Sequence, residues 1–231
     1  MPEPTSLALM GVGSAGLVVC FFQQQYDRAK TCLDFVLGFV LLVVMAPVIG
    51  VCALLVKLTS RGPTFYCQRR LGLHGKPFTL IKLRTMYEDA ERKTGPVWAR
   101  GKRDPRVTPV GAVLRTTHLD ELPQLINVLR GQMSLIGPRP ERPHFVSKFR
   151  EVIPEYDKRM SVKPGITGLA QVRAGYDHNL RDVKRKVKLD LVYIRRMCWW
   201  VDLLIAARTL KKFLEEPDGE AGPMPDSETG S

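Results

Sequence analysis

Two neighbouring carboxylates, Asp120 and Glu121, stand near the start of residues 119–143, which read LDELPQLINVLRGQMSLIGPRPERP. After them, leucine and isoleucine recur at helical spacing as far as Gly131, a residue type that often follows a helix end. The pattern therefore predicts a helix with both carboxylates at its N-terminus. In that position an aspartate often only caps the helix, and a glutamate only complements its dipole. The pair alone does not identify a chemical role.

Basic side chains on both sides of the predicted helix point to a phosphate ligand. Arg115 and His118 precede the carboxylates, and Arg139 follows the helix in a Gly-Pro-Arg-Pro turn at residues 137–140. The prolines of this turn are expected to fix the direction of the guanidinium group. Guanidinium groups held near a helix N-terminus suit a phosphate.

Two further cations, Lys82 and Arg84, lie in a β-like run two residues apart, so both would occupy one face of a strand. Turn-forming residues separate the runs 64–67 and 78–81, which predicts a β-hairpin at the membrane surface. The two cations are either a phosphate clamp or only the solvated edge of this hairpin.

A charge-free apolar run at residues 35–56 must lie in a membrane, because it is long enough for roughly 33 Å of helix. Pro47 near its middle is expected to bend or break the helix. Lysines and arginines flank both ends, which favours both ends on the cytoplasmic side. We therefore predict a re-entrant helix-break-helix over residues 30–58. The alternative is an ordinary, kinked transmembrane helix.

The C-terminal half supplies the remaining predicted elements. Residues 145–156 are expected to form an amphipathic helix, and residues 163–172 (KPGITGLAQV) a tight turn into a short strand. Residues 181–216 are expected to form one long helix in the membrane interface, with two tryptophans at the boundary; a buried core helix is the alternative. A helix at residues 88–93 and a basic loop at residues 94–109 complete the prediction.

Composition limits the class of protein. The 231 residues allow one globular domain with appendages, and the formal net charge of +12 predicts an anionic partner: nucleic acid, lipid headgroups or phosphorylated substrates. Five scattered cysteines predict reduced, buried thiols and argue against a disulfide framework or a zinc site. We expect four regions: a partly apolar extension (1–29), the re-entrant helix (30–58), a cytosolic catalytic domain with interfacial helices (59–216) and a disordered acidic tail (217–231).

Taken together, the motifs resemble those of the bacterial sugar transferases, the monotopic polyprenyl-phosphate phosphoglycosyl transferases, in their minimal catalytic form. The resemblance rests on the apolar segment with its proline, KPFTLIKLRTM, the block at residues 119–143, KPGITGLAQV and the final basic helix. It implies an α+β monotopic membrane protein, with a re-entrant helix, a small β-hairpin and several amphipathic helices at the membrane interface. Relatives often have serine where this chain has Ala46, so the re-entrant geometry rests on Pro47.

The resemblance also implies a reaction, in which a sugar 1-phosphate passes from a UDP-sugar to undecaprenyl phosphate and UMP is released. By the same resemblance, Asp120 is the nucleophile that forms a covalent phosphosugar, and Glu121 binds Mg²⁺. The helix N-terminus is expected to keep Asp120 ionised. Contacts with phosphate are assigned to Arg115 and Arg139, with Lys82 and Arg84 as further candidates. The residues assigned to the substrate pocket are Gln171, Gly137, Pro138 and Pro140.

The implied location is the bacterial inner (cytoplasmic) membrane, with the catalytic domain facing the cytoplasm. The expected partners are a UDP-sugar, undecaprenyl phosphate, membrane lipids and downstream glycosyltransferases, and no nucleic acid. The product would enter exopolysaccharide, O-antigen, capsule or glycoprotein glycan synthesis. The sequence leaves a homo-oligomer and the identity of the sugar open. A membrane-tethered basic scaffold, or a nucleic-acid-binding module without catalysis, is the alternative.

Overall fold

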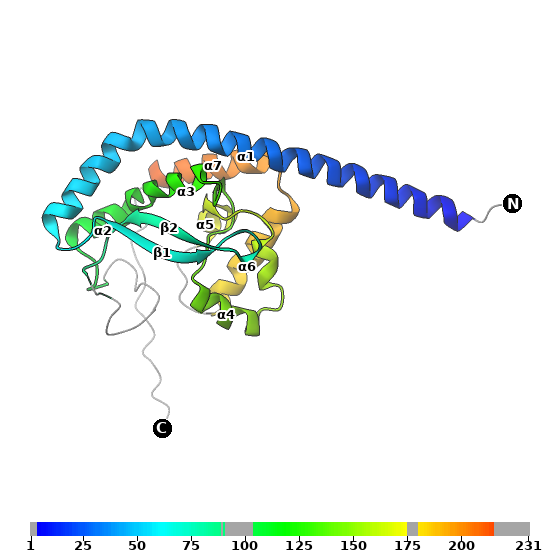
Figure 1. Ribbon diagram of the computed structural model, residues 1–231. Coiled ribbons are helices and arrows are strands. Elements are labelled where there is room, and N and C mark those ends of the chain that lie inside the picture. Colours follow the sequence, from blue (N-terminus) through cyan, green and yellow to red (C-terminus); the bar gives the residue numbers. More distant parts are fainter. Residues whose placement is uncertain (1–3, 89, 91–103, 175–179, 215–231) are drawn as a thin grey trace, which may run out of the picture.

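The computed structural model describes residues 4–88, 90, 104–174 and 180–214. A single helix, α1 (Pro4–Thr59), runs along one side of the molecule (Figure 1). Its segment Gln25–Thr59 is the one described helix that is long and apolar enough to cross a membrane. The expected boundary between residues 29 and 30 lies inside this helix, and the acidic tail, residues 217–231, lies outside the described residues.

The predicted backbone break at Pro47 is wrong, because α1 is helical on both sides of this residue. Figure 1 shows instead that α1 curves towards the domain over its last third, the part that contains Pro47. A proline removes one backbone hydrogen bond and crowds the preceding turn, which is enough to bend a helix whose other bonds persist. The sequence pattern could not distinguish a bend from a break.

One face of α1 packs on the domain along the apolar run. Asp34, Gly38, Cys52 and Val56 are buried at helical spacing, and a Cβ added at Gly38 would lie 3.1 Å from the side chain of Val128. The opposite face is apolar and exposed, with side chains such as Phe39, Val44 and Leu54 more than half exposed. This helix therefore follows the domain surface between residues 34 and 56.

The predicted hairpin is confirmed. Strands β1 (Phe65–Leu71) and β2 (Pro77–Leu83) pair antiparallel, from Phe65 opposite Leu83 to Leu71 opposite Pro77. They are joined by a short 3₁₀ turn, η1 (Leu73–Gly75), in which His74 and Gly75 adopt positive φ angles of 53° and 71°. Strand β2 of the hairpin packs against η3 and carries Lys82.

The central block of the sequence folds into several short elements. Helix α2 (Pro109–Thr116) leads to the 3₁₀ helix η3 (Leu119–Gln124), which continues into α3 (Leu125–Leu129). Strand β3 (Ser134–Ile136) follows, and it pairs in parallel with β4 (Gly165–Thr167). Helix α4 (Pro143–Val152), slightly shorter than the predicted amphipathic helix, and the 3₁₀ helix η4 (Tyr156–Met160) connect the two strands. This arrangement sets residues 137–140 directly beside β4.

Two predictions for the C-terminal half need correction. The short strand predicted within residues 163–172 is present as β4 (Gly165–Thr167), but the residues after it form helix α5 (Leu169–Arg173) instead of extending the strand. The single long helix is two helices, α6 (Leu180–Arg195) and α7 (Trp199–Leu214). No proline or glycine marks the break. The chain turns because Asp202 on α7 is buried against Tyr193 of α6 and Lys30 of α1, and a straight helix could not make both contacts.

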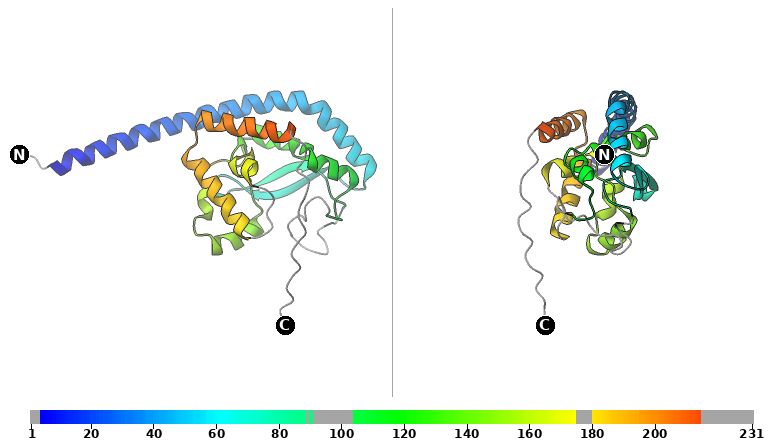
Figure 2. Two further views of the ribbon diagram at one scale, coloured as in Figure 1. Left: turned by 180° about the vertical axis from the view of Figure 1, so that it is seen from behind. Right: turned by 90° about the vertical axis from the view of Figure 1, so that its left-hand side faces the viewer.

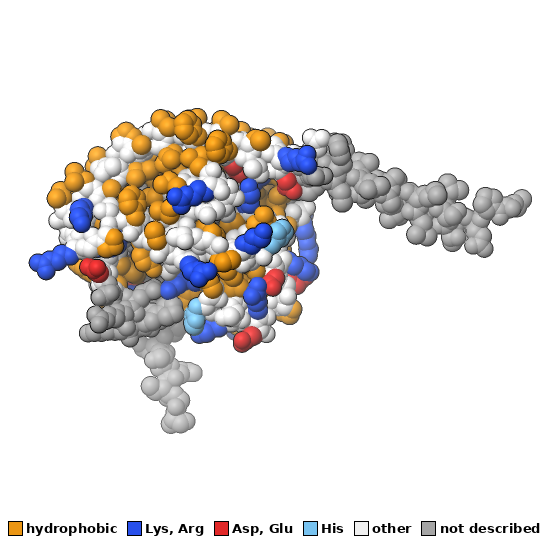
Figure 3. Space-filling view, in the orientation of Figure 1, with side chains coloured by type: hydrophobic (Ala, Val, Ile, Leu, Met, Phe, Trp, Pro, Cys, Tyr) orange, Lys and Arg blue, Asp and Glu red, His pale blue; other side chains and the backbone are white. Residues whose placement is uncertain are grey.

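The exposed apolar surface is concentrated on one side of the molecule. Figure 2 shows α7 alongside α1 from two directions, and Figure 3 shows hydrophobic side chains gathered along the margin formed by α1. On α7, Trp200, Leu203 and Leu210 are each more than half exposed. The described Cys32, Cys67 and Cys198 are exposed and Cys52 is buried, so the expectation of buried thiols holds only for Cys52.

Candidate active site

The carboxylate pair lies at the start of η3, as the sequence predicts for a helix N-terminus. The preceding residue, His118, has a left-handed backbone with φ of 54°, and its carbonyl accepts a hydrogen bond from the Glu121 N–H at 3.1 Å. A positive φ is unfavourable for a residue with a side chain, and such backbone strain is frequent at functional sites. The turn at His118 directs the chain from α2 into η3 and so places Asp120 and Glu121 beside β2.

Glu121 and Arg139 form an ion pair that joins η3 to the Gly-Pro-Arg-Pro turn. The Arg139 Nη1 and Nη2 atoms donate to Glu121 Oε2 and Oε1 at 3.1 and 2.5 Å. Burial alone would raise the pKa of Glu121, but the charge and hydrogen bonds of Arg139 outweigh it and hold the pKa well below its usual value. Glu121 is therefore an ionised carboxylate with its guanidinium partner already in place.

Asp120 is buried, with 4 % of its surface exposed. Burial and the neighbouring Glu121 charge raise the pKa of Asp120 to about 6, although Lys82, Arg139 and Arg115 act in the opposite direction. The sequence analysis expects the helix N-terminus to keep Asp120 ionised, but the pKa of this carboxylate is raised instead of lowered. A short 3₁₀ helix has few aligned peptide dipoles, so desolvation dominates. At neutral pH the carboxylate is still mostly ionised.

Three cations surround the pair from different elements. Burial lowers the pKa of Lys82 on β2 to about 8, while Asp120 and Glu121 counteract this effect; its Nζ also lies 5.5 Å from the ring centre of Tyr66. The positive charge of Arg115 on α2 lowers the pKa of Asp120, and its Nε donates to Thr85 Oγ1 at 2.8 Å. With Arg139, these side chains form a compact basic site around two carboxylates, which suits a phosphorylated ligand.

Arg84, the other basic residue predicted from the hairpin, is not brought into this site. Its Nη2 donates to the carbonyl and the hydroxyl of Ser60 at 2.9 and 2.8 Å, and its Nη1 donates to the Arg61 carbonyl. Strand β2 ends at Leu83, so the alternation that would have placed Arg84 beside Lys82 ends one residue too early. In this position Arg84 fixes the end of α1 to the hairpin.

The residues predicted for the substrate pocket are mostly engaged in backbone packing. The Gly137 N–H donates to the Thr167 carbonyl at 2.8 Å, and a Cβ added at Gly137 would lie 2.5 Å from the Lys163 carbonyl oxygen. The Gln171 Nε2 donates to the Ile166 carbonyl at 3.0 Å, and its Oε1 is buried without a partner among the described residues. Close approach of β3 to β4 therefore requires glycine at position 137.

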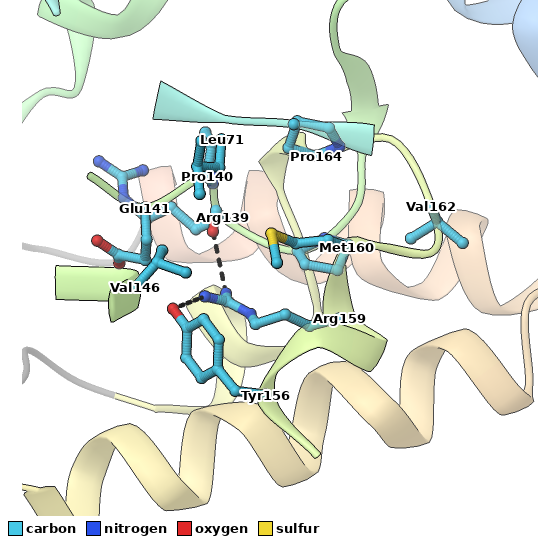
Figure 4. A pocket seen from close by; sticks show the side chains of 12 residues that line it. Leu71, Arg139, Pro140, Glu141, Val146, Tyr156, Arg159, Met160, Val162 and Pro164 are labelled. Carbon is cyan, nitrogen blue, oxygen red and sulfur yellow. Dashed lines mark hydrogen bonds between the residues drawn. The ribbon is translucent and has the colours of Figure 1, made fainter. Parts of the chain in front are cut away.

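Pro138 and Pro140 flank Arg139 and line a narrow cavity behind the turn (Figure 4). Its volume of about 10 Å³ is too small for a sugar nucleotide. A larger cavity of about 240 Å³ lies between α1, η1, β3 and α6, and none of the residues predicted for the site lines it. The basic site around Asp120 borders the narrow cavity through Arg139 and its flanking prolines, and its residues do not line the larger one.

Lys212 on α7 is a member of the site that the sequence analysis missed. It lies close enough to His118 to contribute, after burial and Arg139, to lowering the His118 pKa, and its Nζ donates to the Gln171 carbonyl at 3.3 Å. The sequence analysis placed this helix in the membrane interface and gave Lys212 no role in the site. Lys212 reaches His118 because the chain turns between α6 and α7, and the sequence did not predict this turn.

The two carboxylates of the site are potential ligands of a magnesium ion. No group of three His, Cys, Asp or Glu side chains that could enclose a metal occurs in the described part of the chain. Mg²⁺, however, is commonly held by one or two carboxylates together with substrate phosphates and water. Glu121 fits that requirement as the one carboxylate ligand, with phosphate oxygens of the ligand and water supplying the rest.

Comparison with known proteins agrees with these features. Residues 25–216 match the family model described as "Bacterial sugar transferase". The UDP-glucose:undecaprenyl-phosphate glucose-1-phosphate transferase of Caulobacter vibrioides is 44 % identical over 191 residues, covering 81 % of this chain and 70 % of that protein. The exopolysaccharide production protein PSS of Rhizobium leguminosarum is 37 % identical, covering 82 % of this chain and 97 % of that protein.

A third relative carries the name of a different sugar. The UDP-N-acetylgalactosamine-undecaprenyl-phosphate N-acetylgalactosaminephosphotransferase of Aeromonas hydrophila is 39 % identical over 189 residues, which are 82 % of this chain and 44 % of that protein. The chain therefore spans less than half of this longer relative. What the names of the Caulobacter and Aeromonas proteins share is a sugar phosphate and undecaprenyl phosphate, not the sugar itself.

Proposed function

This chain belongs to the family of bacterial sugar transferases, and we propose that it transfers a sugar 1-phosphate from a UDP-sugar to undecaprenyl phosphate. The observation that carries the proposal is the buried Asp120 carboxylate beside the Glu121–Arg139 ion pair, with Lys82 and Arg115 close by. A carboxylate in a basic site can approach a phosphate that would repel it elsewhere, because the cations neutralise the phosphate oxygens.

In the first proposed step, an oxygen of Asp120 attacks the phosphorus that carries the sugar. A bond forms between that oxygen and phosphorus while the bond between the two phosphates of the UDP-sugar breaks, and UMP leaves with the electron pair. In the second step, a phosphate oxygen of undecaprenyl phosphate attacks the same phosphorus. This displaces the Asp120 carboxylate and yields an undecaprenyl-diphosphate sugar. Dividing the transfer in this way lets one site serve both substrates in turn.

The surrounding side chains would bind and orient these phosphates. Arg139 has five N–H donors, and its Nη1 and Nη2 atoms use one each on Glu121, so the remaining donors would contact phosphate oxygens while Glu121 holds the guanidinium in place. Lys82 and Arg115 would approach from β2 and α2. Magnesium, when bound by Glu121 and the diphosphate, would offset the charge that develops on UMP.

The apolar faces of α1 and α7 suit a membrane-associated protein whose acceptor is a lipid. Phe39 on α1 and Trp200 on α7 are more than half exposed, and Figure 3 shows hydrophobic side chains gathered along the margin formed by α1. We place this side in the inner membrane, with the basic site in the cytoplasm and α1 entering and leaving the same leaflet. The product would then be available to downstream glycosyltransferases of exopolysaccharide or related glycan synthesis.

The experiment that tests this function measures UMP release by detergent-solubilised protein. UDP-glucose, UDP-galactose and UDP-N-acetylhexosamines would be supplied with undecaprenyl phosphate and Mg²⁺, and each component would then be omitted. We expect sustained release with at least one sugar, dependent on the lipid and on Mg²⁺. A basic scaffold or nucleic-acid-binding module would release no UMP with any donor, and that result would contradict the proposal.

A further inference from the structure

The turn that carries Arg139 is bound from behind at three consecutive carbonyl groups. The Pro138 carbonyl accepts from the Gly165 N–H at 2.9 Å, the Arg139 carbonyl from Arg159 Nη2 at 3.0 Å, and the Pro140 carbonyl from Arg70 Nη1 at 3.0 Å. Hydrogen bonds from charged donors are stronger than those between neutral groups. The middle carbonyl, which belongs to Arg139 itself, therefore depends on the side chain of Arg159.

Arg159 is itself held on several sides. Its Nε donates to Asp190 Oδ2 at 2.9 Å, its Nη2 lies 2.6 Å from the same oxygen, and its Nη1 donates to the Tyr156 hydroxyl at 2.8 Å. Figure 4 shows the guanidinium group between the Tyr156 ring and the Arg139 carbonyl. The side chains of Arg159 and Asp190 are only 9 % and 2 % exposed. The position of this guanidinium is thus fixed by η4 and α6, behind the active site.

A buried ion pair of this kind is a poor device for stability alone, because removing two charges from water offsets most of their attraction. An apolar pair could fill the same volume. What an apolar pair could not provide is a charged donor aimed at the Arg139 carbonyl. The carbonyl and the side chain leave the same residue, so fixing the first restricts the path of the second towards Glu121.

We propose that Arg159, anchored by Asp190, is a positioning residue that orients Arg139 for the reaction from outside the active site. This inference rests on the proposed function for its catalytic consequence. Arg159 touches neither carboxylate of the site, and it acts through the backbone of Arg139. The network Asp190–Arg159–Arg139–Glu121 links α6 to the carboxylate pair through hydrogen bonds of 2.5–3.1 Å.

The test is a double-mutant cycle with Arg159→Lys and Arg139→Lys. Lysine at position 159 retains the charge opposite Asp190, but a single ammonium group cannot serve Asp190, Tyr156 and the Arg139 carbonyl in the geometry of a guanidinium. We expect Arg159→Lys to slow UMP release about ten- to a hundred-fold, as for a small misplacement of a binding group. The double variant should lose little more than Arg139→Lys alone, because both changes disable the same group. Losses that multiply, or full activity of Arg159→Lys, would overturn the proposal.

Hydrogen exchange measured by mass spectrometry gives a second readout that needs no turnover. In Arg159→Lys we expect faster exchange confined to residues 134–142, with the remaining core unchanged. Asp190→Asn, which weakens the anchor and leaves Arg159 in place, should act in the same direction. The matched control is Arg150→Lys, which alters an exposed arginine–carboxylate pair with Asp157 and should change neither activity nor exchange at residues 134–142.

These two readouts separate the positioning role from the proposed function. If the wild-type protein releases no UMP from any donor, the proposed function fails, while the exchange data still decide whether Arg159 orders the turn. If the wild type is active and exchange at residues 134–142 is unchanged in Arg159→Lys, the positioning role is wrong and the proposed function stands.

Discussion

Lys30 of α1 and Asp202 of α7, 172 residues apart, form a buried ion pair with 2.6 Å between Nζ and Oδ2. The same carboxylate accepts hydrogen bonds from the hydroxyl groups of Tyr26 and Tyr193 at 2.7 and 2.8 Å. Asp202 therefore joins α1, α6 and α7 at one point. Because α1 and α7 carry the exposed apolar surface, this carboxylate also sets how that surface is arranged.

We predict that Asp202→Ala destabilises the protein by about 3–5 kcal/mol, because it leaves the Lys30 ammonium buried without its partner. Thermal unfolding in detergent should show a clearly lower melting temperature. The double variant Lys30→Met/Asp202→Leu should recover much of the loss, since it removes both charges. Asp157→Ala, which breaks an exposed pair with Arg150, is the control and should cost less than about 1 kcal/mol. A similar loss in both single variants would contradict the role of Asp202.

For Asp120→Asn, we predict complete loss of UMP release and of any covalent phosphosugar adduct, because an amide cannot act as the nucleophile. Intact-mass measurement after exposure to a UDP-sugar without lipid acceptor should detect the adduct in the wild type only. A fully active Asp120→Asn protein would exclude this residue as the nucleophile. Glu121→Gln should still form the adduct, more slowly and at higher Mg²⁺ concentration, since Glu121 is assigned to the metal.

The Asp120→Asn variant should also be more stable than the wild type at neutral pH. The pKa of Asp120 is raised to about 6 in the folded protein, from 3.8 as its ordinary value. Between these values the folded state binds more protons than the unfolded state, so the stability due to this group falls as the pH rises through the window. The amide of the variant cannot ionise and avoids the loss. Melting temperatures of both proteins at pH 4 and pH 7 would test this, with Asp157→Asn as the surface control.

The sequence predicted those parts of the fold and site that depend on local patterns. The hairpin follows from two β-like runs around turn residues, and Asp120, Glu121 and Arg139 meet because a short helix and a rigid turn connect them. Arg84 lies outside the predicted phosphate-binding group because β2 ends at Leu83, and no local sequence pattern marks that end. The bend at Pro47 also depends on the domain surface on which α1 packs.

The buried charge networks were missed because their partners are distant in the sequence. Asp190 and Asp202 each stand alone between apolar residues in α6 and α7, in KLDLV and WVDLL. A single carboxylate on an otherwise apolar helix face must find a buried partner or remain at the surface. That pattern could have marked both residues as members of ion pairs. It could not have identified Arg159 or Lys30 as the partners, since this depends on how α6, α7 and α1 pack.

The pH dependence of catalysis should have two limbs. Asp120 must be ionised to attack phosphorus, so kcat/KM for the UDP-sugar should rise as the pH passes through about 6 and level off above it. Lys82 must be protonated to bind phosphate, and burial lowers its pKa to about 8, so the rate should fall above that pH. Lys82→Arg, which keeps its charge, should retain activity on the alkaline side. An alkaline limb unchanged in Lys82→Arg would show that another group causes it.

The last prediction concerns the path of α1. Its face from Asp34 to Val56 packs on the domain, and both ends of this stretch therefore lie next to the same domain surface. We predict that single cysteines at Arg28 and Arg61 are both labelled from the cytoplasm only, by a membrane-impermeant maleimide in spheroplasts and in inverted vesicles. The background must lack the native cysteines, because Cys32, Cys67 and Cys198 are exposed and would react. A cysteine replacing Arg150 on the domain surface is the control for cytoplasmic labelling. Labelling of the two positions from opposite sides would mean that α1 spans the membrane, and the re-entrant path would be wrong.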